Sequence, residues 1–158
     1  MKTPQPVVFE PELIEAMRQV FEERIVFNSV LGLKLKHIDA THCVASMQMK
    51  PELVGHFAYG RLHGGAISAA LDTTGGAAVL AAVAAKHMHE SMEERMKRFM
   101  KLGTIDLRVD YLRQGIGHNF EIRAEVLRAG SRVASTRMEL LDDHGKLLAT
   151  GSAAYIVS

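Results

Sequence analysis

The residues with the clearest chemical meaning are two glycines and a carboxylate in one apolar run. The run begins Leu62-His63-Gly64-Gly65 and continues to Asp72. If a helix starts at the glycines, its first backbone N–H groups have no partner within the helix, and its dipole is positive at that end. Glycines let a ligand oxygen approach the backbone closely, so this sequence is suited to hold an oxyanion. The alternative is a glycine-rich helix start that serves packing only.

Asp72 is the only charged residue between Leu62 and Ala85 when histidine is counted as neutral. A carboxylate buried without a partner is costly, so it must be paired, hydrogen-bonded or protonated. In a catalytic role such a group acts as a general base or as a nucleophile. In a structural role it would cap a local backbone group.

The spacing of Gly64 and Asp72 constrains how they cooperate. Eight residues of helix separate them by about 12 Å along the axis. One carbonyl group cannot lie about 3 Å from the Gly64 N–H and also within reach of Asp72 of the same chain. If the two act together, they come from different subunits, and a two-fold dimer creates that meeting twice. We therefore predict a homodimer with intersubunit active sites.

Composition limits the class of protein. The chain has 158 residues, of which 47% are hydrophobic and 23% charged, which predicts a single globular domain over 1–158. Its one cysteine, Cys43, excludes an internal disulfide and any Cys-based zinc cluster. Nineteen basic residues against eighteen acidic ones give no electrostatic argument for a nucleic-acid ligand. Residues 1–6 lack the apolar core of a signal peptide, so a cytoplasmic location is expected.

The elements that must position these residues follow from hydrophobic periodicity. After an extended lead-in at 1–10, apolar residues at helical spacing predict a helix from Pro11 to about Asn28. A long helix is expected at 63–86. It is apolar on nearly all sides, but its Ala, Gly, Ser and Thr content and Asp72 argue against a membrane span. A shorter amphipathic helix within 87–101 has a Ser91–Glu94 capping box and an apolar face of Met92, Met96, Phe99 and Met100.

Alternating residues predict the strands. Two are expected at 32–39 and 41–49, joined as a hairpin and followed by a loop at 52–62. Four more are expected at 105–111, 120–126, 133–141 and 146–157, with short turns that make neighbours antiparallel. At the start of the first of these four strands, Thr104 belongs to the polar set of alternating residues and Ile105 belongs to the apolar set. An antiparallel sheet of about six strands curved around the long helix is an α+β hotdog fold.

Two motifs carry a family resemblance. His63-Gly64-Gly65 followed by Ala70-Leu71-Asp72, together with the segment 104–113, resembles the PaaI-like hotdog thioesterases and especially their YigI subgroup. The resemblance covers about residue 21 to the C-terminus. It implies that Asp72 serves acyl-CoA hydrolysis, that the Gly64 N–H polarises the thioester carbonyl, and that Thr104 helps hold the attacking water. It also implies dimers or dimers of dimers.

His56 marks a departure from that family. Many relatives carry an asparagine shortly before His-Gly-Gly, where it assists the carbonyl site, whereas this loop reads Gly55-His56-Phe57-Ala58-Tyr59-Gly60. An imidazole N–H can donate the same hydrogen bond, with a pH sensitivity that an amide lacks. The alternative is a histidine in a solvent-facing loop.

The remaining candidates have weaker patterns. His63 either orients the glycine loop or touches the thioester, and Gly65 is a candidate substrate contact. Arg128, Ser131 and Arg132 flank a turn where they either meet CoA phosphates or form a solvated basic surface. His87 and His89 lie in a polar stretch that is more typical of surface than of a metal site. Cys43 alternates with apolar residues and is expected in the core.

The sequence therefore predicts a thioesterase for medium- or long-chain, or aryl, acyl-CoA that needs no metal or other cofactor. The Met-rich segment 88–100 would line or cover the acyl channel. The rival interpretation is a non-catalytic acyl-CoA binding or sensing module on the same fold. A hotdog hydratase or dehydratase would need a different His/Asp arrangement.

Overall fold

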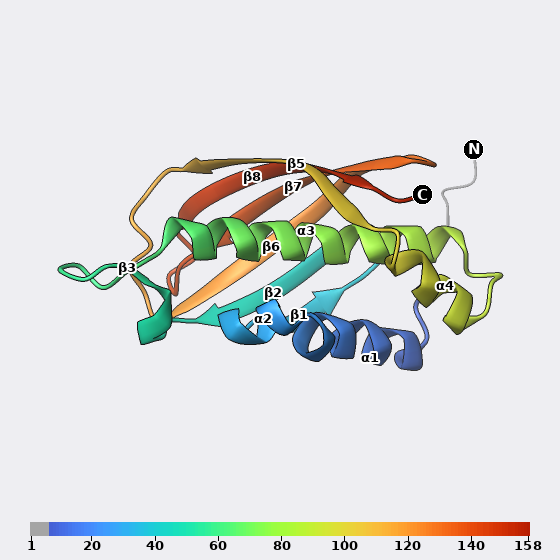
Figure 1. The fold of residues 1–158 in the computed structure, drawn as a ribbon, viewed down its shortest axis with the longest axis horizontal. Coiled ribbons are helices and arrows are strands. Elements are labelled where there is room, and N and C mark those ends of the chain that lie inside the picture. The colour runs from blue at the N-terminus through green and yellow to red at the C-terminus, as the bar shows by residue number, and fades with distance from the viewer. Residues whose placement is uncertain (1–6) are drawn as a thin grey trace.

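The computed structural model describes residues 7–158 and has the predicted α+β hotdog architecture (Figure 1). The helices are α1 (Pro11–Gln19), α2 (Val26–Leu31), α3 (Gly64–Lys86) and α4 (Met92–Phe99). The strands are β1 (Lys34–Ile38), β2 (His42–Gln48), β3 (Val54–His56), β4 (Arg61–Leu62), β5 (Gly103–Tyr111), β6 (Asn119–Ala129), β7 (Val133–Leu141) and β8 (Leu147–Ile156). In the lead-in predicted at 1–10, residues 7–10 lie in neither helix nor strand, and residues 1–6 lie outside the described part.

The main sheet is antiparallel, with the strand order β1-β2-β6-β7-β8-β5. Figure 1 shows α3 running between this sheet and the layer formed by α1 and α2. Helix α3 is long and apolar enough to cross a membrane, but most of it is buried inside the protein. It is the core helix that the sequence predicted, and its Ala and Gly residues let the strands pack closely around it.

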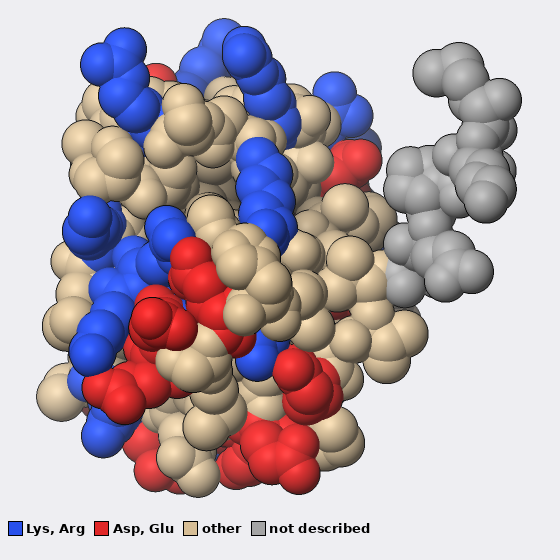
Figure 2. All heavy atoms as spheres, turned by 90° about the vertical axis from the view of Figure 1, so that its right-hand side faces the viewer, with Lys and Arg blue, Asp and Glu red and all other residues tan. Residues whose placement is uncertain are grey.

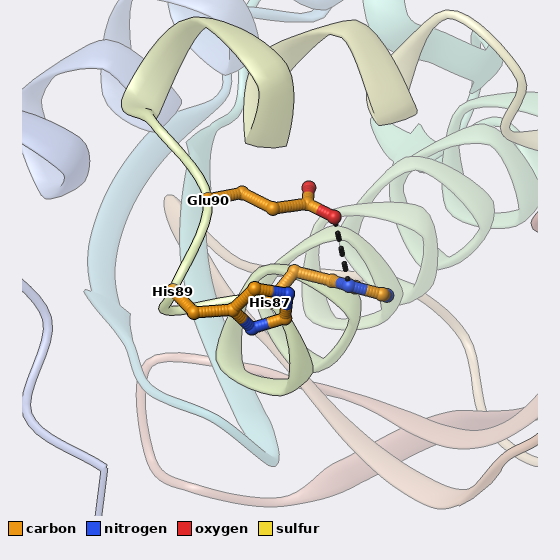
Figure 3. A group of neighbouring side chains, drawn as sticks. All are labelled: His87, His89 and Glu90. Atoms are coloured by element: carbon orange, nitrogen blue, oxygen red, sulfur yellow. Dashed lines mark ion pairs between the residues drawn. The ribbon is translucent and has the colours of Figure 1, made fainter.

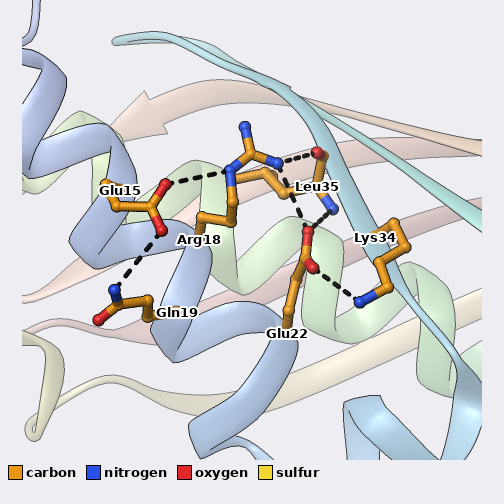
Figure 4. Close-up of polar contacts among 6 residues, drawn as sticks. All are labelled: Glu15, Arg18, Gln19, Glu22, Lys34 and Leu35. Atoms are coloured by element: carbon orange, nitrogen blue, oxygen red, sulfur yellow. Dashed lines mark hydrogen bonds and ion pairs between the residues drawn. The ribbon is translucent and has the colours of Figure 1, made fainter.

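The N-terminal helix differs from the prediction because it is not continuous to Asn28. A turn of π-helix at Val20–Arg24 follows α1, and Ile25, whose backbone is not helical (φ −81°, ψ 89°), then separates it from α2. Polar contacts with β1 fix this shape (Figure 4). Glu22 accepts hydrogen bonds from the Leu35 N–H at 2.8 Å and from Lys34 Nζ at 2.9 Å. Burial raises the pKa of Glu22, but these bonds outweigh burial and lower the pKa below its ordinary value.

Two other segments depart from their predicted form. The loop predicted at 52–62 contains a small hairpin in which β3 pairs with β4. Helix α4 has the predicted capping box, but Met92 and Met100 of its predicted apolar face are exposed. The buried residue of α4 is Arg95, whose guanidinium donates to Glu10 at 2.9 and 3.1 Å. The aliphatic stem of an arginine packs like an apolar side chain once its head is paired.

Adjacent glycines in α3 have different surroundings. A Cβ at Gly75 would overlap with the buried Tyr155 hydroxyl and lie 3.1 Å from Met138 Sδ, so glycine lets α3 approach the sheet here. A Cβ at Gly76 would lie 3.7 Å from both Leu102 and Tyr155, an ordinary contact distance. Each glycine costs the helix about 1 kcal/mol relative to alanine. Only at Gly75 does packing against the sheet explain that cost.

We predict opposite effects of alanine at these two positions on the free energy of unfolding. Gly76→Ala should raise it by up to about 1 kcal/mol through helix propensity. Gly75→Ala gains the same propensity but must displace Tyr155, so it should be less stable than Gly76→Ala by about 1–3 kcal/mol. Urea unfolding followed by circular dichroism, at equal protein concentration, measures the difference. Equal stabilities would contradict this account of Gly75.

Candidate active site

Asp72 is the ninth of the 23 residues of α3, and its half-buried carboxylate faces the first residues of β5. The Thr104 hydroxyl donates to both carboxylate oxygens, at 2.9 and 3.2 Å. Asp72 and Thr104 line one cavity of about 270 Å³, whose other walls are mostly apolar. The structure therefore brings two of the predicted catalytic residues together at the edge of a hydrophobic space.

A β-bulge turns Thr104 toward the helix. Along the pairing of β5 with β8, Thr104 lies opposite Tyr155 and Asp106 opposite Ala154, which leaves Ile105 as an extra residue. Thr104 therefore shares its face with Leu107, whose partner is Ala153. Strict alternation had placed Thr104 with Asp106 on the polar face, and that prediction was wrong. A bulge commonly re-aims one side chain in this way.

Tyr155 fixes the backbone of Asp72 from the sheet, a role that the sequence did not predict. Its hydroxyl donates to the Asp72 backbone oxygen at 2.8 Å. Burial raises the pKa of Tyr155 far above its ordinary value, so the hydroxyl stays protonated and able to donate. This bond fixes α3 to β8 at the position of Asp72. No sequence signal distinguishes Tyr155 from any other inward-facing strand residue.

Asn28 and Thr73 were also missed, and they connect the N-terminal layer to α3. Thr73 Oγ1 donates to the buried Asn28 Oδ1 at 3.0 Å, and Asn28 Nδ2 donates to the Phe21 carbonyl at 2.8 Å. Phe21 lies in the π-helical turn and lines the cavity beside Thr73. A π-helical turn frequently marks a functional site. Here Asn28 holds that turn against the helix that carries Asp72.

The glycine motif begins α3 as predicted. His63 is the N-cap, and its Nδ1 accepts a hydrogen bond from the Gly65 N–H at 2.8 Å. Within residues 7–158 the Gly64 N–H has no hydrogen-bond acceptor, whereas the Gly64 carbonyl accepts from the Tyr111 hydroxyl at 2.9 Å. His63 thus orients the loop, and the Gly64 N–H rather than the Gly65 N–H is free to bind an oxyanion.

Gly64 and Asp72 line different cavities of this chain. Gly64 and His63 belong to a second space of about 500 Å³, bordered by Tyr111 and by residues 112–115. The cavity at Asp72 shares none of these residues. The two halves of the predicted site are therefore apart within one subunit.

His56 lies at the end of β3, beside the second cavity but outside its lining. Its ring stacks on Phe57 at 5.5 Å between centroids and lies 4.8 Å from the ring of Tyr59. The Nδ1 atom is buried, with no hydrogen-bond partner among residues 7–158. His56 is therefore part of an aromatic cluster on a protruding hairpin, where Phe57 is 95% exposed.

Arg128, Ser131 and Arg132 are exposed at the turn between β6 and β7. This turn meets the other end of α3, where Lys86 Nζ donates to the Ala129 carbonyl. Figure 2 views the molecule from the side that carries α4, and it shows basic side chains along the upper and left parts and acidic ones concentrated below. The turn is thus distant from Gly64, and its contact with CoA stays a prediction.

The His87, His89 and Glu90 side chains gather where α3 ends (Figure 3). Their potential ligand atoms lie within 4.8 Å of one another. Both Glu90 oxygens accept hydrogen bonds from Arg98, which lowers the pKa of Glu90 to about 2. His87 Nδ1 lies 3.2 Å from the same carboxylate. The ion pair between Glu90 and Arg98 connects the segment after α3 to α4.

Cys43 is fully buried in the core, as predicted. Burial raises the pKa of its thiol to about 12, which disfavours the reactive thiolate.

The antiparallel sheet wrapped around α3 defines the hotdog fold, and the Asp72–Thr104 pair gives that fold a carboxylate suited to hydrolysis. The family model of the thioesterase superfamily matches residues 59–149, so the chain belongs to this superfamily. It is a thioester hydrolase.

Comparisons with individual sequences and with solved structures identify more specific relatives within the superfamily. Proteins named medium/long-chain acyl-CoA thioesterase YigI, from Salmonella typhimurium and Escherichia coli, are each 34% identical over 151 residues, which is 96% of this chain and 97% of theirs. A crystal structure from Shewanella oneidensis, described as related to the thioesterase superfamily, has 38% identity and a TM-score of 0.87, and the match covers 95% of this chain and all of that one. A second structure, from Syntrophus aciditrophicus, has 36% identity and a TM-score of 0.83 over 93% of this chain and 97% of its own.

We predict that the Thr104 hydroxyl, and not merely its volume, supports hydrolysis. Thr104→Val keeps the shape but removes the donor to Asp72, and hydrogen bonds to charged groups contribute about 1.5–3 kcal/mol. Turnover should fall by about 10- to 100-fold, whereas Thr104→Ser should stay within about 3-fold of the parent. Thiol release from an acyl-CoA measures both. Equal activities of the valine and serine variants would exclude the hydroxyl from the mechanism.

Proposed function

We propose that the protein hydrolyses medium- or long-chain acyl-CoA to the free acid and CoA. The observation that carries the proposal is the Asp72–Thr104 pair at the edge of a mostly apolar cavity. At about 270 Å³ this cavity is slightly smaller than the pockets that enclose whole drug-sized ligands, so it suits the acyl chain and not the entire substrate. The names of the YigI relatives support the same substrate class.

Two chemical routes fit the carboxylate. As a general base, Asp72 takes a proton from water, the hydroxide adds to the thioester carbon, and the C–S bond then breaks to release CoA thiolate. As a nucleophile, Asp72 adds directly, a mixed anhydride forms as CoA thiolate leaves, and water cleaves the anhydride. In both routes we propose that Thr104 orients the carboxylate through its hydrogen bond and that its hydroxyl oxygen also contacts the attacking water.

The carbonyl oxygen becomes an oxyanion in either route, and the free Gly64 N–H is the proposed donor. Its position at the start of a 23-residue helix adds the positive end of the dipole. His63 contributes by holding the loop through Gly65. His56 on the neighbouring hairpin is the candidate second donor, because its buried Nδ1 has no partner in the described chain.

The edge strand β5 supports an intersubunit site. In the sheet it pairs with β8 on one side only, and an unpaired strand edge is suited to add another strand. One end of β5 contacts Asp72 through Thr104, and the other end contacts Gly64 through Tyr111. If two copies of β5 pair antiparallel, the Thr104 end of one lies beside the Tyr111 end of the other. Asp72 of one subunit then lies near Gly64 of its partner, at two equivalent sites.

Substrate phosphates need basic partners, and Arg128, Ser131 and Arg132 remain the proposed ones. Their exposure makes them accessible to a ligand. We also propose that the protein acts in the cytoplasm, where acyl-CoA is available.

The direct test of the function is hydrolysis of an acyl-CoA series by the parent protein and by Asp72→Asn. The substitution keeps the size of the side chain and removes its basicity, so turnover should fall by at least about 100-fold. Circular dichroism checks the fold of the variant. A folded Asp72→Asn protein that releases thiol at the parent rate would remove Asp72 from the mechanism.

A mixed-dimer experiment tests the intersubunit site. Gly64→Pro deletes the N–H at a position where proline suits a helix start, and His63 already has the extended backbone that precedes proline readily. This variant should lose about 100- to 1000-fold in turnover, whereas Gly64→Ala keeps the donor and should lose far less. Purified heterodimers of Gly64→Pro with Asp72→Asn have one intact site and should recover about half of the parent activity.

If each active site were formed within a single chain, the heterodimer would show the opposite result. Each subunit of the heterodimer would then carry one defect, and activity would stay at the level of the variants.

A further inference from the structure

The cavity at Asp72 runs as a channel along one face of α3. Its lining residues on this helix recur at helical spacing, at 69, 72, 73, 76, 77 and 80. The opposite wall comes from α1, the π-helical turn and α2, and these elements meet α3 near Asp72 through the Asn28–Thr73 bond. Leu80 is the last residue of α3 in the lining, with Met17 and Phe99 also in the channel wall.

The length of the channel determines how many acyl carbons it can hold. Asp72 and Leu80 are eight residues apart, which is about 12 Å along the helix. A saturated chain with bonds of about 1.52 Å and angles near 111° advances by about 1.25 Å per carbon. An acyl chain whose thioester lies at Asp72 therefore needs about ten carbons to reach Leu80.

Gly76 lies midway, one helical turn beyond Asp72. A side chain here would project between Leu102 and Tyr155, and both of these residues line the channel. The contact distance of 3.7 Å to each shows that alanine fits, so packing does not require glycine. Gly75, by contrast, is required by the approach of Tyr155. Because position 76 has no side chain, the channel is wider at this point.

We propose that Gly76 is a specificity-determining residue that keeps the channel open beyond about the fifth acyl carbon, which makes chains of about ten carbons the best substrates. This inference rests on the proposed acyl-CoA thioesterase function. A leucine at 76 would fill the channel between the thioester and Leu80. Longer chains would then lose the burial of their outer methylenes, each of which contributes about fourfold in affinity.

The test compares the parent with Gly76→Ala and Gly76→Leu on butyryl-, hexanoyl-, octanoyl-, decanoyl- and dodecanoyl-CoA. The measured quantity is the ratio of kcat/KM for decanoyl-CoA to that for butyryl-CoA. We expect this ratio to fall at least 10-fold in Gly76→Leu and by a smaller factor in Gly76→Ala. Ala154→Val adds bulk on β8 outside the channel lining and is the matched control, with the parent ratio expected.

A binding measurement separates this proposal from the proposed function. The thioethers S-decyl-CoA and S-butyl-CoA cannot be hydrolysed, and titration calorimetry gives their affinities whether or not the protein is an active thioesterase. Gly76→Leu should weaken S-decyl-CoA at least 10-fold more than S-butyl-CoA. If the parent protein hydrolyses none of these acyl-CoA substrates, the proposed thioesterase function is wrong. If folded Gly76→Leu and Gly76→Ala keep both the parent ratio of kcat/KM and the parent ratio of S-decyl-CoA to S-butyl-CoA affinity, Gly76 does not determine specificity.

Discussion

The hydrogen bond between Thr104 and Asp72 is the contact on which the arrangement of the site depends. It joins the middle of the core helix to the edge strand of the sheet. The half-buried Asp72 can occupy an otherwise apolar helix because its carboxylate has this partner, whose single proton is shared between its two oxygens, and an unpartnered carboxylate there would be costly. Tyr155 fixes the backbone of the same residue from β8. Asp72 is thereby held from two strands, by its carboxylate from β5 and by its backbone from β8, and it lines the cavity.

Periodicity predicted the fold well, because a helix apolar on all sides needs a sheet around it. It also predicted the beginning of α3 and the separation of Gly64 from Asp72, since both follow from helix geometry alone. It was wrong about the face of Thr104. The single extra residue at Ile105 shifts the alternation, and a bulge depends on pairing with β8 that no local pattern records.

Other misses share a tertiary origin. The N-terminal helix has an uninterrupted helical pattern, yet Glu22 and Asn28 bind groups on β1 and in the π-helical turn and break it. Arg95 is buried because Glu10, far away in the chain, pairs with its guanidinium. Tyr155 has the role of a positioning residue only because Asp72 happens to lie opposite it. Apart from the bond between Asn28 and Phe21, these partners lie in different elements, so the spacing of residues within one segment could not predict them.

The channel wall formed by residues 17–28 has a consequence for how such proteins diversify. The superfamily match at 59–149 contains Gly64, Asp72 and Thr104, but it excludes this wall. One wall of the channel is thus encoded apart from the groups suited to break the bond, whereas the wall that carries Gly76 and Leu80 is encoded in the same stretch as those groups. The N-terminal stretch contacts α3 through the Asn28–Thr73 bond and apolar packing, and none of its side chains bonds to the Asp72 carboxylate in the described chain. Substitutions in residues 17–28 would therefore reshape one wall of the channel while Gly64, Asp72 and Thr104 keep their identities.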